Sequence, residues 1–361
     1  MALDHIALTT FRNHASSRLT QTAQLNLLVG ENGAGKTNVL EALSLFSPGR
    51  GLRRAPLAEI AGGDGAQGFA VSARLTSADG GAPVQLGTGV LPEKPGRRLV
   101  QVNGAEASAI SLGEWLAVSW LTPAMDRLFM DSAGSRRHYM DRLAVALDPA
   151  HARHASRYEN ALRERNRLLS DLREPDPQWL ASIEAQMAQH GALLAQGRAR
   201  LIAALTQELA THPEQPFAQP ILEHLAGGPV EEQALAQLWA ASRKRDRAAS
   251  RTLAGPHRDE LKVTMAGKNA AAAQCSTGEQ KAMLIAITLA HAGLAASGRP
   301  GLLLLDEVAA HLDPLRREAL FARLRDTGTQ TWLTGTEPAP FADILGEAAC
   351  WKVSAGTLGR L

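Results

Sequence analysis

Gly30-Glu31-Asn32-Gly33-Ala34-Gly35-Lys36-Thr37 is the stretch of sequence that decides the fold. A strand-like run at residues 25–29 precedes it and a helix-like run at residues 38–43 follows it, the setting that a G-x-x-x-x-G-K-[ST] loop requires. The glycines let backbone N–H groups surround a phosphate, and the following helix adds its positive N-terminal end. We therefore expect a nucleotide site in which Lys36 reaches the β- and γ-phosphates and Thr37 ligates Mg²⁺.

A second stretch supplies what phosphate binding alone lacks. The apolar run at residues 302–305 ends in Asp306 and Glu307. We expect a buried strand to deliver Asp306 to the metal ion and Glu307 to the attacking water, as nucleotide hydrolysis requires. Lys36 and Glu307 are thus the predicted catalytic residues, and Thr37 and Asp306 the predicted metal ligands.

The composition is typical of a globular protein without a targeting segment. The chain has 361 residues, of which 45% are hydrophobic and 20% charged, so it is long enough for two or three domains. No run of 18 apolar residues occurs, and the N-terminus lacks a basic region before an apolar stretch. These features argue against secretion and a membrane partner, and for a cytoplasmic protein. Cys275 and Cys350 are too few for a disulfide framework or a structural zinc site.

Sequence texture divides the chain into three segments. Residues 1–123 predict strands, at 69–75 and 84–90 and in a hairpin that closes at Asn103-Gly104. Residues 124–252 have apolar residues at helical spacing, with breaks at 174–177 and 212–213, and predict an all-helical lobe. Residues 253–361 return to alternating strands and helices. Because the two nucleotide motifs flank the helical segment, we expect an α/β fold in which one discontinuous nucleotide-binding domain carries an inserted lobe.

Three further motifs resemble those of ABC-type ATPases. Ser276-Thr277-Gly278-Glu279-Gln280 opens a helix before the leucine-rich strand, like the signature loop that caps the γ-phosphate of the opposite subunit, although an ordinary helix N-cap is the alternative. His311-Leu312-Asp313 resembles the D-loop, which crosses the dimer interface. Thr334-Gly335-Thr336 stands where these ATPases place a switch histidine, and a threonine hydroxyl can orient water but carries no charge. The resemblance implies an ABC-type, SMC-like ATPase head that binds ATP and Mg²⁺ and forms an ATP-dependent homodimer.

The finer pattern is similar to the bacterial RecF family, recombination-mediator ATPases related to SMC heads. It is carried by Phe11-Arg12-Asn13, by residues 36–42, 136–141 and 165–169, and by Gly255-Pro256-His257-Arg258-Asp259. The resemblance implies that Arg12 and Asn38 lie near the nucleotide. It also implies a weak, DNA-stimulated ATPase that acts with RecR and RecO at gapped DNA and single-strand/double-strand junctions, where it helps to load the recombinase.

The basic residues give candidates for DNA contact. The net charge is only +2, yet 31 of the 38 basic residues are arginines, which bind phosphates bidentately. A GC-rich genome also produces arginine and alanine together, and it is the more economical explanation of this bias. The DNA-binding candidates are Arg50, Arg53 and Arg54 after the P-loop helix, and Arg243, Lys244 and Arg245 in the densest basic run; solvated surfaces are the alternative for both.

Two other functions share these motifs. The nucleotide-binding subunit of an ABC transporter is one, but the long helical insertion and the missing switch histidine argue against it. A non-catalytic DNA adaptor that uses ATP only to dimerise is the other.

Overall fold

The computed structural model describes residues 2–62, 68–76, 81–211 and 216–361. Contacts group the chain into two compact units: a head unit of residues 1–126, 213–218 and 281–361, and a helical unit of residues 127–212 and 219–280. The helical unit therefore begins close to the expected boundary at 124 but extends past 252 to Gln280. No helix of the described ranges is long and apolar enough to cross a membrane.

One sheet of the head unit is antiparallel, with strand order β2-β1-β4-β5-β6-β7. Its strands are β1 (Ala2–Phe11), β2 (His14–Leu19), β4 (Phe69–Thr76), β5 (Val84–Val90), β6 (Arg98–Val102) and β7 (Ala105–Glu106). β4 alternates buried side chains with exposed or half-buried ones, as expected for a sheet that covers a core on one face. The predicted strands at 69–75 and 84–90 and the hairpin turn at Asn103-Gly104 are confirmed.

The other sheet of the head unit is mixed, with strand order β15-β14-β3-β13-β12-β8. Its strands are β3 (Leu25–Val29), β8 (Ala117–Leu121), β12 (Gly301–Leu305), β13 (Gln330–Gly335), β14 (Ala349–Ser354) and β15 (Thr357–Arg360). The neighbouring pairs from β14 to β8 are parallel, and β3, β8, β12 and β13 are buried at every residue. Because these strands run in parallel, their carboxyl ends lie at one edge, which brings together the ends of β3, β12 and β13.

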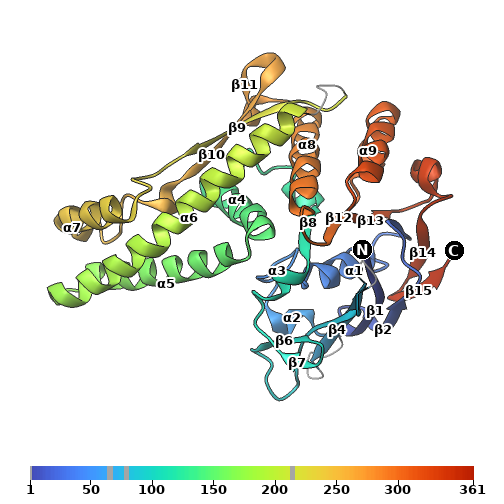
Figure 1. The fold of residues 1–361 in the computed structure, drawn as a ribbon, viewed down its shortest axis with the longest axis horizontal. Coiled ribbons are helices and arrows are strands. Elements are labelled where there is room, and N and C mark those ends of the chain that lie inside the picture. Colours follow the sequence, from blue (N-terminus) through green and yellow to red (C-terminus); the bar gives the residue numbers. More distant parts are fainter. Residues whose placement is uncertain (1, 63–67, 77–80, 212–215) are drawn as a thin grey trace. The chain divides into compact units, whose positions relative to one another are not determined.

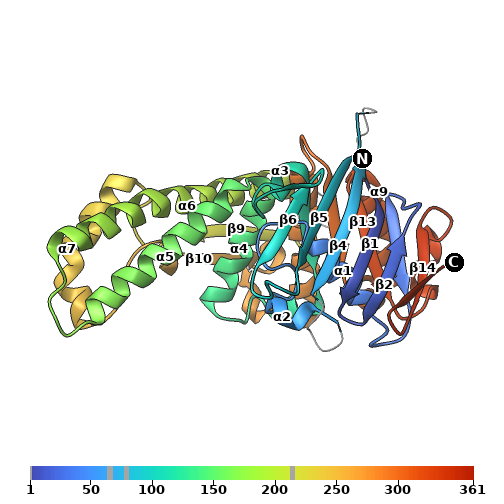
Figure 2. The same cartoon turned by 90° about the horizontal axis from the view of Figure 1, so that it is seen from below.

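Helices complete the head unit (Figures 1 and 2). They are α1 (Lys36–Ser44), α2 (Leu57–Ile60), α3 (Leu112–Trp115), α9 (Pro314–Asp326) and most of α8 (Thr277–Ala295), with 3-10 turns η1 (Pro123–Met125), η5 (Ala309–His311) and η6 (Ala339–Ile344). α1 is the central helix, because its Val39, Leu40 and Leu43 are fully buried in a cluster with side chains from both sheets.

The helical unit consists of four long helices and a small sheet. Its elements are α4 (Ala133–Leu147), α5 (Ala150–Ser170), α6 (Pro177–Thr211) and α7 (Glu232–Ala248), the strands β9 (Pro220–Leu225), β10 (Glu260–Met265) and β11 (Ala270–Ala271), and the 3-10 turns η2 (Pro256–Arg258), η3 (Ala266–Lys268) and η4 (Ala272–Gln274). The expectation of an all-helical segment at 124–252 missed β9. β9 pairs antiparallel with β10, which lies beyond residue 252, so only a long-range partner stabilises it as a strand.

Buried arginine pairs hold the helical unit together. Arg198 on α6 is 3% exposed and donates to both oxygens of Asp141 at 2.8 Å and to Asp259 at 2.8 Å. Burial opposes ionisation of Asp141, but Arg198 and His151 outweigh it and hold the pKa of this carboxyl well below its usual range. The pair therefore fixes α6 against α4 and the start of β10 as a charged but satisfied contact.

Candidate nucleotide site

The loop between β3 and α1 encloses a pocket of about 120 Å³. Its lining residues are Asn32, Gly33, Gly35, Lys36, Thr37, Asn38, Arg53 and Glu307. Gly33 and Gly35 have φ of 80° and 114°, a region that favours glycine, and Gly35 is the N-cap residue of α1. The Lys36 ammonium donates to the carbonyls of Gly30 at 2.6 Å and Glu31 at 3.0 Å. The predicted loop is thus formed, with its lysine folded over it.

The back of this loop is held by residues that the motif does not include. Asn13 donates from Nδ2 to the carbonyl of Ala34 at 3.0 Å, and His14 Nε2 lies 3.0 Å from the carbonyl of Gly35. Because a carbonyl only accepts, Nε2 of the fully buried His14 carries the proton. The N–H of Gly356, in the β14–β15 turn, also donates to Ala34 at 2.9 Å. Both ends of the chain therefore fix the loop from behind.

Asp306 stands at the carboxyl end of β12, opposite the start of α1. The Thr37 hydroxyl donates to Asp306 Oδ1 at 2.9 Å, and Thr334 at the end of β13 donates to the same oxygen at 2.9 Å. The backbone N–H of Glu307 in turn donates to Thr334 Oγ1 at 2.8 Å. The three strand ends are thereby joined into one chain of hydrogen bonds, from the loop to Glu307.

The surroundings of Asp306 suit a metal ligand. The side chain is 6% exposed, and burial raises its pKa, an effect that the hydroxyls of Thr334 and Thr37 only partly offset. In the described part of the chain, no arginine or lysine is hydrogen-bonded to this carboxylate. A hydroxyl and a carboxylate beside a phosphate-binding loop fit Mg²⁺, which keeps several waters and takes few protein ligands.

Glu307 has a left-handed backbone conformation, with φ of 53°. A non-glycine residue in this region stores strain that the surroundings must compensate, and such residues cluster at functional sites. The compensation here is the hydrogen bond to Thr334. The conformation places Glu307 at the pocket, where the sequence predicted it, while Thr336 lies exposed beyond the end of β13.

Two arginines near the pocket bind the same buried carboxylate. Glu41 on α1 is 0% exposed, and Arg12 binds both of its oxygens, at 2.9 and 2.7 Å. Arg53 donates to Glu41 at 2.8 Å and to Asn38 at 2.7 Å, and it lines the pocket. Sequence reasoning placed Arg53 on a DNA surface; its position here is at the nucleotide pocket. Arg50 and Arg54 are exposed.

The signature segment caps α8 at the edge of the helical unit. Ser276 and Glu279 form a reciprocal capping box, with Ser276 N–H donating to Glu279 at 2.9 Å and Glu279 N–H to Ser276 Oγ at 3.4 Å. Hydrogen bonds from Lys268 and Ser276 lower the pKa of Glu279 to about 2. Gln280 is buried and donates to the carbonyl of Cys275 at 2.9 Å. Ser276 and Gly278 are exposed, and a Cβ on Gly278 would meet open space, so the helix start is accessible.

The D-loop and the second basic cluster have local structural roles. Asp313 is the N-cap residue of α9 and accepts from Arg316 N–H at 3.0 Å; the backbone of His311 ends η5. On α7, Arg243 binds the buried Glu184 at 2.6 Å, whereas Lys244 and Arg245 are exposed. Arg243 is thus committed to an internal ion pair.

Comparisons with known proteins agree with this geometry. The family model described as the RecF/RecN/SMC N terminal domain matches residues 2–339. A DNA replication and repair protein RecF from Mesorhizobium japonicum is 46% identical over 99% of this chain and 97% of its own length, and one from Brucella suis is 44% identical over 99% and 96%. Among solved structures, the recombination mediator protein RecF with ATPrS covers 100% of this chain and 98% of its own, with a TM-score of 0.86 at 23% identity. An Smc head domain from Pyrococcus furiosus has a TM-score of 0.56 at 15% identity, covering 99% and 95%.

The fold and the loop, strand-end and signature motifs define a P-loop head of the ABC and SMC type. Within that class, the identity of 44–46% to RecF proteins over nearly the full length decides the family. The chain belongs to the RecF family of DNA replication and repair proteins.

Proposed function

We propose that this protein binds ATP with Mg²⁺ and dimerises on it, and that the dimer binds DNA in replication and recombinational repair. The observation that carries the proposal is the hydrogen bond from Thr37 to Asp306, which unites two motifs that lie far apart in the sequence. A relative of this family was solved as RecF-ATP, which supports ATP as the nucleotide.

The pocket residues divide the work of hydrolysis. Lys36 leaves its loop carbonyls to neutralise phosphate charge, and Thr37 and Asp306 would hold Mg²⁺, which would neutralise further charge on the phosphates. Glu307 accepts a proton from the attacking water, and Thr334 fixes the backbone from which Glu307 extends. Because a threonine stands where a switch histidine would supply positive charge, turnover is slow, and DNA stimulates it by stabilising the dimer.

The ATP site is completed by a second copy of the chain. Ser276 and Gly278 offer an exposed helix start to the γ-phosphate bound by the partner, and Asp313 follows at the same interface. Light scattering of a Glu307→Gln protein should show a dimer with ATP and a monomer with ADP, and Ser276→Arg should abolish the dimer. A Ser276→Arg protein that still dimerises with ATP contradicts the two-chain site.

The DNA substrate that we propose is gapped DNA at a single-strand/double-strand junction, where RecO and RecR act with the dimer to load the recombinase. Exposed Arg50 and Arg54 supply phosphate contacts, each of which adds roughly −0.9 to the slope of log affinity against log salt on duplex DNA. Changing both to Ala should flatten this slope in the ATP-bound protein and leave nucleotide affinity unchanged. No DNA binding at low salt with ATP present would reject the proposal and favour a transporter subunit.

A non-catalytic adaptor is the remaining alternative. If the parental protein dimerises with ATP but does not hydrolyse it above background, the protein uses ATP only as a dimerisation ligand. If Glu307→Gln instead hydrolyses ATP at the parental rate, the base lies elsewhere.

A further inference from the structure

α5 in the helical unit carries a line of exposed arginines. Arg153, Arg157, Arg163 and Arg167 are exposed, and Asn160 lies exposed between them. Their spacing of four, six and four residues keeps them on one side of a helix with 3.6 residues per turn. Between the first and the last of them the helix rises by roughly 21 Å. We call these five residues the α5 stripe.

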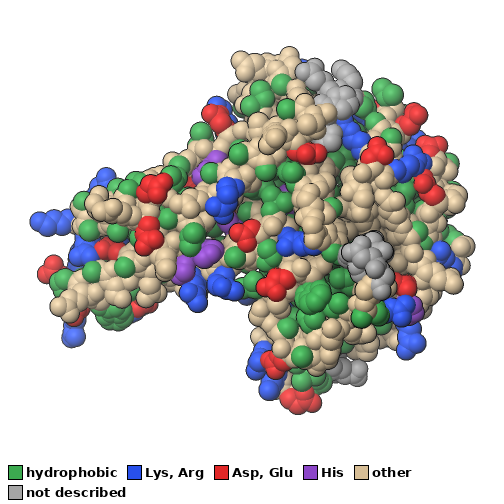
Figure 3. Space-filling view, in the orientation of Figure 1, with side chains coloured by type: hydrophobic (Ala, Val, Ile, Leu, Met, Phe, Trp, Pro, Cys, Tyr) green, Lys and Arg blue, Asp and Glu red, His purple; other side chains and the backbone are tan. Residues whose placement is uncertain are grey.

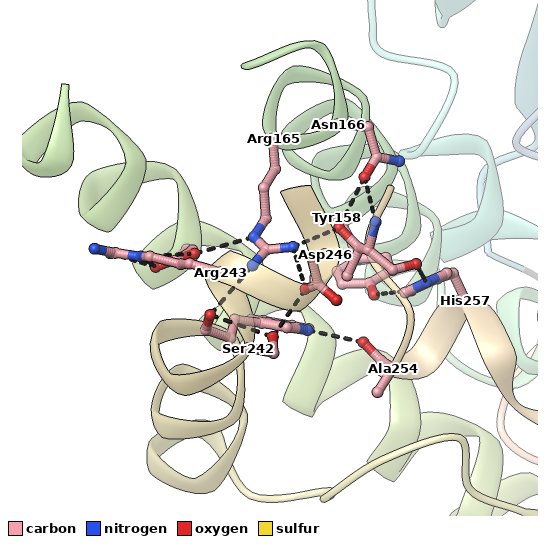
Figure 4. Close-up of polar contacts among 11 residues, drawn as sticks. Tyr158, Arg165, Asn166, Ser242, Arg243, Asp246, Ala254 and His257 are labelled. Carbon is pink, nitrogen blue, oxygen red and sulfur yellow. Dashed lines mark hydrogen bonds and ion pairs between the residues drawn. The ribbon is translucent and has the colours of Figure 1, made fainter. Parts of the chain in front are cut away.

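Buried contacts fix the rotation of α5 so that the stripe faces solvent. Arg165, which is 0% exposed, donates to Glu184 on α6 at 3.0 Å and to Asp246 on α7 at 2.8 Å (Figure 4). Tyr158, also buried on α5, has its hydroxyl 2.8 Å from His257 Nδ1, and its ring lies 6.2 Å from that of Trp239 in a tilted arrangement. Because these residues occupy the inward side of α5, the stripe belongs to a rigid and preorganised face.

An aromatic side chain extends the stripe. Trp179, in the first turn of α6, is 49% exposed, and the Arg167 guanidinium lies 5.7 Å from the centre of its ring. Leu172, in the loop that joins α5 to α6, is 100% exposed. Figure 3 shows Lys and Arg side chains at the end of the helical unit where α5, α6 and α7 lie together. A large exposed indole costs hydration free energy, which a stacked ligand would recover.

From this arrangement we infer that the α5 stripe and Trp179 form a binding surface for single-stranded nucleic acid, separate from the nucleotide pocket. The arginines follow the phosphates of the strand, and an unpaired base stacks on the half-exposed ring of Trp179, beside Arg167. Positive grooves combined with aromatic stacking platforms are how proteins bind single strands without sequence preference.

The charges of α5 suit a polyanion better than a protein partner of mixed charge. Glu164 is paired with Arg167 at 2.6 Å, and the exposed Glu159 offsets one further charge, so Arg153, Arg157 and Arg163 still leave the exposed side of α5 with a net positive charge. Arg163 likewise orients Asn160 through a hydrogen bond. The inference rests on the proposed function for the identity of the strand as DNA, and it adds a single-strand site on a unit that lacks the nucleotide loop.

The test uses the full-length protein and a fluorescent 20-nucleotide oligothymidylate, measured by anisotropy across a salt series. Changing Arg153, Arg157 and Arg163 to Ala should flatten the slope of log affinity against log salt by roughly 2, since each contact to a single strand contributes about 0.7. The matched control changes Arg18, Lys94 and Lys352 to Ala, three exposed cations of the head unit, and so removes the same net charge. The slope of this control should stay within about 0.3 of the parental slope. We take this margin as the experimental error, and it is about half of the slope that one phosphate contact contributes.

Stacking is tested separately at Trp179. Trp179→Ala should weaken oligothymidylate binding by roughly tenfold, whereas Trp179→Phe, which keeps an aromatic face, should retain most of the affinity. Thermal melting and ATP-induced dimerisation should be unchanged in all these variants, because the residues lie outside the core and the nucleotide pocket.

The outcomes separate this inference from the proposed function. If the parental protein binds duplex and gapped DNA but the stripe variant and Trp179→Ala bind oligothymidylate normally, the single-strand surface is not on α5. If the stripe variant loses duplex and single-strand binding equally while Trp179→Ala is normal, the stripe binds backbone only and the stacking site is overturned. If the parental protein binds no DNA with ATP present, the proposed function itself fails.

Discussion

Two aspartates, one in each unit, show opposite uses of the same side chain. Asp141 in the helical unit is clamped by Arg198, and its pKa is held well below the usual range. Within the described residues, the carboxylate of Asp306 in the head unit accepts hydrogen bonds only from threonine hydroxyls, and burial raises its pKa. The first carboxylate is already neutralised by the protein and serves the fold. The second is left with unbalanced charge, which a bound cation would balance, so it serves the ligand.

The largest effects should come from substitutions at the nucleotide pocket of the head unit. Glu307→Gln should lower ATP turnover by about 10²–10⁴-fold while nucleotide still binds, because the role that we propose for this carboxylate involves only the attacking water. Lys36→Met should instead lower nucleotide affinity by about a hundredfold or more, since two charge-assisted contacts to phosphate are lost. Equilibrium binding of a fluorescent ATP analogue and steady-state hydrolysis distinguish the two. Equal losses of affinity in both variants would contradict the division of roles.

Breaking the pair in the helical unit should cost stability instead. Arg198→Met leaves the buried Asp259 and the partly exposed Asp141 without this cation and should lower the free energy of unfolding by about 3–5 kcal/mol. Urea unfolding followed by circular dichroism measures the change. The control is Arg200→Met on the same helix, where the side chain is 64% exposed and its contact with Asp148 spans 4.0 Å, so the expected change is within about 0.5 kcal/mol.

Thr334 links the cation site to the base, and its loss should have an intermediate effect. Thr334→Val removes the hydrogen bonds to Asp306 and from Glu307 N–H, so the strained backbone at Glu307 loses its support. Turnover should fall by roughly tenfold with a smaller change in affinity for ATP. Thr334→Ser keeps the hydroxyl and should restore most of the rate. If both variants hydrolyse ATP at the parental rate, Thr334 does not position Glu307.

The sequence predicted the parts of this site whose signals are local. The loop at Gly30–Thr37 and the strand that ends in Asp306 each combine a motif with a flanking apolar run, so both were found at the correct elements. The support from His14 and from Gly356 was not foreseen, because it depends on contacts between the loop and both ends of the chain.

The same limit applies to the helical unit. Arg165 and Arg198 occur in arginine-rich helices, where charged residues are usually solvated, yet both are buried. Their partners are known only from the packing of the helices: Arg165 on α5 pairs with Asp246 on α7, and Arg198 on α6 pairs with Asp141 on α4. β9 was read as part of a helical segment because its partner strand, β10, lies some 40 residues further along the chain. Burial of a charge and pairing of a strand are both decided by residues distant in sequence, where periodicity carries no signal.

The smallest effect should come from Asp306→Asn, which tests directly whether Asp306 and Asp141 differ in their roles. Asp306→Asn keeps an oxygen that accepts from Thr37 and Thr334 but removes the buried charge, so the ligand-free protein should gain up to about 1 kcal/mol at pH 7. The pKa of Asp306 is higher in the folded than in the unfolded chain, so its ionised form costs stability above the folded-state pKa. That cost shrinks as the pH falls through the folded-state pKa towards the ordinary value of 3.8, and the advantage of Asp306→Asn should narrow over the same range.

Thermal melting from pH 7 to pH 4, with and without Mg²⁺ and ATP, measures both the stability of the ligand-free protein and the stabilisation that the ligands add. The variant should lose the stabilisation that Mg²⁺ adds to ATP, while Asp141, whose lowered pKa gives the opposite sign, contributes stability that disappears only at more acidic pH. A variant that is less stable than the parent without ligand would mean that Asp306, like Asp141, serves the fold, and the contrast between the two carboxylates would fail.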